Sequence, residues 1–221
     1  MVASGGGEGF RVGGVRPGRL AEVLGEPPTP EGTWEREAVY LSAAALRRRI
    51  APEELAAVLR DLEGVETVEV RGNGFLRITV DTPGELLDDP HTPVDVEDPW
   101  PDLPRTWDNP GFVVKYAHAR AAAVLRWARE LGVPRDGFAP SVLTDPRDRA
   151  VLRLLAELPG RRMGRDPGWA AYLPRLALAY HDAHEGAPAV PKGDEEPDPV
   201  HTARVRLAEV VLVVLPGPER I

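Results

Sequence analysis

Three clustered arginines, Arg161, Arg162 and Arg165, are the residues best suited to binding chemistry, and Gly160 and Gly164 stand beside them. Guanidinium groups bind phosphate through paired hydrogen bonds, and glycine lets a phosphate backbone approach closely. We predict that this cluster lies in a loop and contacts RNA phosphates. An ordinary solvated basic surface is the alternative.

Two histidines, His181 and His184, stand one helical turn apart, a spacing that some metal sites use. Asp182 and Glu185 are the only carboxylates next to them, and the chain has no cysteine. Cationic side chains near the end of a helix are the simpler explanation, because they favour the negative end of the helix dipole. We predict no metal and no cofactor.

Charge is spread unevenly over the 221 residues, whose net charge is −8. Residues 1–104 hold 10 arginines against 20 acidic residues, whereas residues 105–221 hold 17 Lys and Arg against 15 Asp and Glu. An acidic surface repels nucleic acid. We therefore expect any RNA contact on the C-terminal half, and a protein partner for the acidic N-terminal half.

Composition excludes several classes of protein. The absence of cysteine rules out disulfides and thiolate catalysis in this chain, and it is compatible with the cytoplasmic location that we expect. No run approaches 18 apolar residues, so we expect no membrane contact. The glycine-rich residues 1–15 lack the pattern of a signal peptide, and we expect a flexible tail there.

Residues 108–129 predict the helix around which the chain is organised. Asp108 or Asn109 can cap it, Pro110 suits its first turn, and Gly132 follows its end. Apolar residues form two adjoining stripes, so we expect neighbours on most sides and a place at the centre of a helical bundle. The stripes are Val113, Tyr116, Ala117, Val124, Trp127 and Leu131, and Val114, Ala121 and Leu125.

This helix carries a family resemblance through Asn109, Pro110, Phe112, Val114, Tyr116, Ala117, His118, Ala119 and Arg120. The run resembles the opening helix of the anticodon-binding domain (DALR type) of arginyl-tRNA synthetases. Within it, we interpret His118 as a buried hydrogen-bonding residue rather than a catalyst. We interpret Arg120 as the partner of an intramolecular carboxylate or carbonyl rather than of a phosphate.

The N-terminal part reads as a small α/β layer over residues 16–80. We predict helices over 34–50 and from Pro52 to Gly64, then a β-hairpin from Val68 to Val80 that turns at residues 72–74. This order, ending in Gly-Phe-Leu-x-Ile-x-Val, resembles the N-terminal domain of the same synthetases.

The remaining chain completes an α+β protein with an all-α C-terminal domain over residues 108–221. Residues 81–107 hold six prolines and eight acidic residues in 27 positions, so we predict a linker without regular structure. Further helices are predicted over 149–158, 169–184 and 202–215, with an acidic loop at 188–199 before the last.

The resemblance implies that the catalytic core of a synthetase is missing. In that family a nucleotide-binding domain lies between the two parts matched here, with a His-Ile-Gly-His type motif and a lysine-rich loop. This chain has no His-x-Gly-His, and Lys115 and Lys192 are its only lysines. We therefore predict a protein that is not an enzyme.

The resemblance also points to residues that would read RNA. Phe75 keeps an aromatic that faces the tRNA D-loop in the family, whereas Arg77 stands where asparagine is usual. Val113 replaces a usual tyrosine and Lys115 a usual glutamine near the anticodon, beside Tyr116 and Ala117. The chain ends in Ile221, where the family has methionine. Phe75 could stack on a base or could cover the edge of the core.

Three hypotheses follow. The first is a non-catalytic synthetase-like protein that binds tRNA or a tRNA-like RNA through its helical bundle. The second is a protein-interaction or regulatory scaffold that has lost RNA binding. The third is a half-enzyme that acts with a separate catalytic chain.

Overall fold

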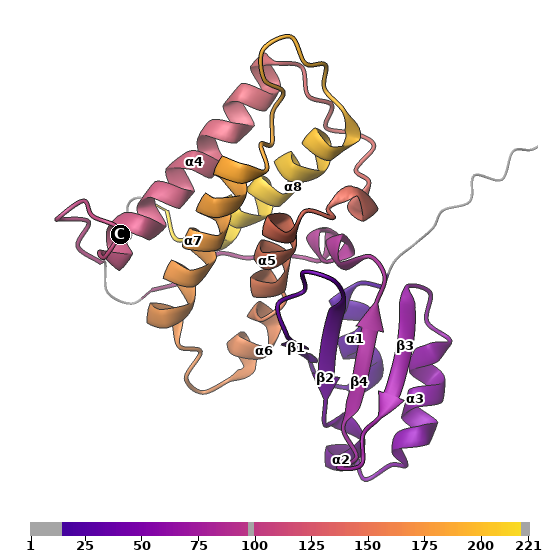
Figure 1. The fold of residues 1–221 in the computed structure, drawn as a ribbon. Helices are drawn as coiled ribbons and strands as arrows, with labels where there is room; N and C mark the ends of the chain where they lie inside the picture. The colour runs from indigo at the N-terminus through magenta and orange to yellow at the C-terminus, as the bar shows by residue number, and fades with distance from the viewer. Residues whose placement is uncertain (1–14, 97–99, 218–221) are drawn as a thin grey trace, which may run out of the picture.

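The fold is α+β, as the sequence predicts, with a sheet unit followed by a helical unit (Figure 1). It comes from a computed structural model that describes residues 15–96 and 100–217. The sheet has the order β1-β2-β4-β3 and is antiparallel throughout. Its strands are β1 (Thr29–Glu31), β2 (Ala38–Ser42), β3 (Val65–Val70) and β4 (Leu76–Val80), and its helices are α1 (Pro17–Leu24), α2 (Ala44–Arg48) and α3 (Pro52–Arg60).

The predicted hairpin is confirmed as β3 and β4, and α3 starts at the predicted Pro52. Alternation along β4 buries Leu76 and Ile78 with Leu20 of α1 and Leu59 of α3. The intervening Arg77 therefore lies on the opposite face of the sheet, which these helices leave uncovered. The groups around Arg77 on this open face decide whether it could contact RNA.

The helix predicted over residues 34–50 is wrong. Residues 38–42 form the central strand β2, which pairs with β1 on one side and β4 on the other, and only the five residues of α2 are helical. Trp34 has a positive φ of 65°, which breaks any helix there, and its indole Nε1 donates to the Val39 carbonyl at 3.1 Å. Pairing on both sides overrides the local helical pattern of the segment.

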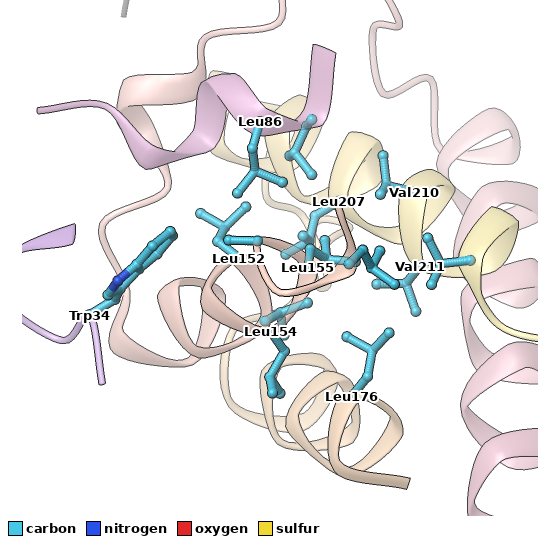
Figure 2. Close-up of a cluster of buried hydrophobic side chains, with 14 of the residues drawn as sticks. Trp34, Leu86, Leu152, Leu154, Leu155, Leu176, Leu207, Val210 and Val211 are labelled. Atoms are coloured by element: carbon cyan, nitrogen blue, oxygen red, sulfur yellow. The ribbon is translucent and has the colours of Figure 1, made fainter. Parts of the chain in front are cut away.

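The helical unit contains α4 (Pro110–Glu130), α5 (Pro146–Leu155), α6 (Leu158–Met163), α7 (Trp169–Gly186) and α8 (Pro199–Val214). Asn109 rather than Asp108 caps α4, accepting from the amides of Gly111 and Phe112. The α4 helix packs against α7 and α8, and α5 packs against α7. Figure 2 shows the core that they share, where leucines of α5, Leu176 of α7 and Leu207 and Val211 of α8 meet.

The central position predicted for α4 is wrong, because its buried face is narrow. Val113, Val114, Ala117, Ala121, Val124 and Ala128 are buried. Trp127 is 44% exposed and Leu131 is 49% exposed, although both belong to the stripe expected to face inward. Small alanines allow close packing on one side of α4, while its large residues stay outside. Figure 1 accordingly shows α4 along one side of the unit.

The segment predicted as an unstructured linker is partly helical and docks on the helical unit. A 3-10 helix, η1 (Pro83–Asp88), buries Leu86 and Leu87 and lies against the short 3-10 helix η2 (Pro140–Val142). A Cβ at Gly84 would collide with the Pro140 carbonyl, so this contact requires glycine. The Val94 amide then donates to the Val214 carbonyl at 3.0 Å.

Arginines of α5 join the two units through backbone carbonyls of the β1–β2 region. The Arg153 Nε lies 2.8 Å from the Gly32 oxygen, and its Nη2 lies 3.2 Å from the Pro30 oxygen. The Arg149 Nη1 lies 3.0 Å from the Arg36 oxygen. Each guanidinium thus donates to backbone carbonyls of the sheet unit.

A buried carboxyl group, that of Asp148, lies inside the helical unit. Asp148 is 1% exposed, and its Oδ2 accepts from the Arg204 Nε at 2.9 Å. Burial raises the pKa of Asp148 to about 6, against the opposing effect of the Arg204 guanidinium. The folded-state pKa lies above the unfolded value, so this carboxyl disfavours folding at neutral pH, and its penalty fades as the pH falls from about 6 towards 4.

We expect Arg153→Ala to lower the free energy of unfolding by about 2–3 kcal/mol, because it leaves carbonyls of the junction without donors. The control is Arg126→Ala on the exposed side of α4, where a change of no more than about 0.5 kcal/mol is expected. Urea denaturation followed by circular dichroism measures both. Equal midpoints would show that the arginine contacts contribute nothing to the junction.

We expect Arg204→Met to destabilise the protein by about 3–5 kcal/mol at pH 8, because it leaves the Asp148 carboxylate buried without a cation. The loss should shrink at pH 5, where Asp148 takes up a proton. Urea midpoints at the two pH values test this. Arg135→Met is the control, since Arg135 forms an exposed ion pair with Glu209. A pH-independent loss in Arg204→Met would contradict the role given to Asp148.

Candidate nucleic-acid interface

Four rings gather where α4 begins, and we call Trp107, Phe112, Tyr116 and His181 the aromatic surface. Ring centroids lie 5.8 Å apart for Trp107–Phe112, 5.5 Å for Trp107–Tyr116 and 4.6 Å for Trp107–His181. Phe112 and Tyr116 are one helical turn apart on α4 and stack with centroids 5.5 Å apart. His181 joins them from α7.

The N-cap of α4 positions these rings. Asn109 ends the extended approach to α4, and its Nδ2 also donates to the Pro104 carbonyl at 2.9 Å. The entering chain is thereby turned so that Trp107 lies over the first turns of the helix. Trp107 is 50% exposed, so half of this large ring is open to a ligand. Unpaired bases stack on such rings, since every base presents a π-face.

The cations next to the aromatic surface are already paired. Lys115 Nζ lies 2.9 Å from an Asp102 oxygen, and this hydrogen bond lowers the pKa of the Asp102 carboxyl. Arg120 lies over the Tyr116 ring at 4.6 Å and forms an ion pair with Glu185. The expected intramolecular role of Arg120 is confirmed. The surface therefore offers rings more readily than free positive charge.

The basic cluster is not the open loop that the sequence predicts. Arg161 and Arg162 belong to α6, and their guanidinium groups are occupied within the protein. Arg161 lies 2.6 Å from a Glu157 oxygen and 4.7 Å from the Tyr172 ring centre. Arg162 donates to the Thr92 carbonyl at 2.6 Å. Among the described residues, Arg165 alone of the three is exposed without a hydrogen bond or ion pair.

Phe75 and Arg77 lie in the sheet unit, away from the aromatic surface. Phe75 is half-buried after the β3–β4 turn. Arg77 lies 2.6 Å from a Glu37 oxygen and 3.9 Å from oxygens of both Glu31 and Glu69. Arg71 lies 3.7 Å from Glu31 as well, so three carboxylates face two guanidinium groups and the neighbourhood stays slightly acidic. This part of the open sheet face does not attract phosphate.

Three curated relatives match about half of this chain, and all three are arginine–tRNA ligases. The chain is 40% identical over 130 residues to an arginine–tRNA ligase of Clavibacter sepedonicus, a match that covers 52% of this chain and 24% of the ligase. It is 41% identical over 118 residues to that of Frankia alni, covering 50% and 21%, and 40% identical over 117 residues to that of Kineococcus radiotolerans, again covering 50% and 21%.

Over about half of its length, this chain is related to arginine–tRNA ligases. It spans about a quarter of the length of the curated relatives that it matches, so their whole activity does not transfer to it directly. No protein-family model matches the sequence, and no solved structure matches it. In the part of the chain that the structure describes, no helix is long and apolar enough to cross a membrane.

Two expected RNA-reading residues of this synthetase-related protein are inside its core. Val113 is 2% exposed and Ala117 is 1% exposed, because both lie on the narrow packed face of α4. Their side chains cannot touch RNA without repacking the helix. Lys115 and Tyr116, by contrast, are partly exposed beside the aromatic surface. Ile221 lies outside the described residues.

The two histidines of α7 do not converge on a common point for a metal. The His181 ring packs on Trp107, whereas the His184 ring lies 6.4 Å from that of Trp127. His118 is half-buried on α4, and burial lowers the pKa of its imidazole. Within residues 15–96 and 100–217 no group of three or more metal-binding side chains occurs.

Sequence reasoning missed Trp107 and His181 as site residues. Trp107 falls in the segment interpreted as a linker, and the sequence presents His181 only as a metal ligand or as a cation near the end of a helix. The available signal was the spacing of Phe112 and Tyr116 on one helical face with a tryptophan just before the cap. The partner from α7 depends on tertiary packing, which no local pattern shows.

Proposed function

We propose that this chain binds tRNA, or a tRNA-like RNA, without catalysing aminoacylation, and that unpaired bases stack on the aromatic surface. The half-exposed Trp107, packed on three other rings at the start of α4, is the observation that carries the proposal. The relation to arginine–tRNA ligases supports tRNA as the RNA. A cytoplasmic location, where tRNA acts, belongs to the same proposal.

Stacking fits the surface better than phosphate binding. Aromatic rings contribute about 1–3 kcal/mol for each stacked base, whatever its identity. Phosphate binding needs cations whose donors are free, and here Lys115 and Arg120 are paired with carboxylates. We therefore propose an affinity with a modest dependence on salt.

The absence of catalysis is part of the proposal and is supported by the lysines. A lysine-rich catalytic loop requires several lysines close together, and this chain has Lys115 and Lys192 alone. Lys115 lies within α4 and binds Asp102, and Lys192 lies in the loop before α8. Neither lysine is placed beside the other to form such a loop.

A protein-interaction scaffold is the second candidate, and the open face of the sheet favours it. Arg77 is surrounded there by Glu31, Glu37 and Glu69, so the face presents acidic groups where RNA contact was expected. Such a face suits a basic protein segment better than RNA. In this candidate the aromatic surface has no RNA-binding role.

We expect Trp107→Ala to weaken tRNA binding by about 5- to 150-fold, the equivalent of about 1–3 kcal/mol of lost stacking. The slope of log affinity against log salt should stay nearly unchanged, because no phosphate contact is removed. Fluorescence anisotropy of labelled total tRNA at several salt concentrations measures both quantities.

Trp127→Ala is the matched control, since Trp127 is a similarly exposed tryptophan on α4 that lies outside the aromatic surface. It should bind tRNA as the wild type does. Equal losses in the two variants would remove the aromatic surface from the proposal. No binding of wild type even at low salt would favour the scaffold.

We expect the purified chain to show no arginine-dependent exchange of pyrophosphate into ATP, because it carries no lysine-rich loop. The measurement uses labelled pyrophosphate with saturating arginine and ATP, in the presence and absence of tRNA. A complete arginine–tRNA ligase serves as the positive control. Exchange above the level without protein would overturn the non-catalytic assignment.

A further inference from the structure

A small cavity lies where three distant segments meet. Its volume is about 190 Å³. Pro17 at the start of α1 forms one wall, residues 86–92 form a second, and the end of α5 with the start of α6 forms the third. Apolar side chains make most of the lining: Pro17, Leu86, Pro90, Leu155, Ala156, Leu158 and Pro159.

The polar groups of this junction cavity leave unused hydrogen-bond acceptors. Asp89 accepts from the Gly18 amide with its Oδ2 at 2.9 Å, and no described residue donates to its Oδ1. His91 Nε2 lies 2.9 Å from the Leu86 carbonyl oxygen, so that nitrogen carries the hydrogen. The other ring nitrogen, Nδ1, is then an acceptor.

Arg162 also lines the cavity, together with Thr92, but its guanidinium is engaged elsewhere. Its Nη2 donates to the carbonyls of Thr92 and Pro93, and its side chain is exposed at the cavity rim. Water therefore screens its charge, whereas burial raises the pKa of the Asp89 carboxyl. The cavity thus combines apolar walls with two acceptors, on Asp89 and His91, that receive no hydrogen bond from the described residues.

We propose that the junction cavity binds a compact apolar molecule that carries a protonated primary amine. The ammonium group supplies N–H donors to Asp89 and His91, and the apolar part fills the space between Leu86, Leu155 and Leu158. An apolar cavity of about 150 Å³ accommodates benzene, so the volume suits one ring or a branched alkyl group. This site is independent of the RNA binding proposed above.

Binding at this cavity stabilises the junction between the units. Pro17 belongs to the sheet unit and Leu155 to the helical unit, so a ligand that contacts both favours their docked arrangement. Any molecule that binds only the folded state raises the melting temperature with its concentration.

The test compares benzylamine, benzyl alcohol and benzoate as probes, by isothermal titration calorimetry and thermal unfolding of the full chain. Benzylamine should bind saturably and raise the melting temperature, and benzyl alcohol should bind at least several-fold more weakly. Benzoate should not bind, because Asp89 repels it. Absence of saturable benzylamine binding, or equal binding of benzoate, would overturn the proposal.

Two variants locate the site. Asp89→Asn keeps an acceptor for the Gly18 amide but removes the charge. It should lower the affinity for benzylamine at least tenfold and leave the affinity for benzyl alcohol unchanged. Ala156→Leu fills the cavity and should abolish binding of both; its folding is checked by circular dichroism. Asp88→Asn, an exposed neighbour that does not line the cavity, is the control. Unchanged benzylamine affinity in Asp89→Asn would refute the site even if Ala156→Leu failed to fold.

Discussion

The joint between the two units depends on arginine side chains that donate to backbone carbonyl oxygens. Pro30 of β1 and Gly32 and Arg36 of the loop after it turn their carbonyls towards α5. A carbonyl that loses water at such a junction and finds no donor costs up to about 1–3 kcal/mol. One guanidinium has five N–H donors, so Arg153 serves both Gly32 and Pro30. These arginines therefore help to hold the sheet on the bundle.

The same use of arginine shapes what the surface can bind. Arg161 and Arg162 look like a phosphate site in the sequence, yet Glu157 holds the first and the segment at Thr92 holds the second. An arginine whose donors already point to protein oxygens must break those contacts before it can bind phosphate. A chain with 27 Lys and Arg thus has far fewer cations ready for RNA than the composition suggests. Aromatic rings at the start of α4 are not subject to this competition.

The sequence predicts elements well where the signal is local. Asn109 and Pro110 mark the start of α4, alternation marks β3 and β4, and Pro52 marks the start of α3. The starts predicted at residues 149 and 202 each lie three residues after the prolines that begin α5 and α8. It fails where the state depends on distant partners. Residues 38–42 become a strand because β1 and β4 pair with them on both sides. Helical spacing puts Trp127 in an apolar stripe of α4. Only packing against α7 and α8 decides which residues of that stripe are buried.

In the candidate site, too, local features could be predicted and features that depend on tertiary packing could not. Phe112 and Tyr116 could be placed on one face of a helix from their spacing, whereas the contact of Trp107 with His181 requires the packing of α7 on α4. Arg161 as a phosphate contact stays a prediction, but the loop expected around it is the helix α6. Glu157 stands one helical turn before Arg161, and this ion pair supports the helix.

Position 113 shows how packing bears on an interpretation from the sequence. The resemblance described above implies a tyrosine at this position in synthetases, so the valine suggests the loss of an RNA contact. In the structure Val113 is 2% exposed and packs inside the bundle. A tyrosine there would overfill the core or turn α4 about its axis, at a cost of about 1–3 kcal/mol. Val113 therefore suits the close packing of α4 in this chain, and Trp107 and Tyr116, outside the core, are the rings that a base can reach.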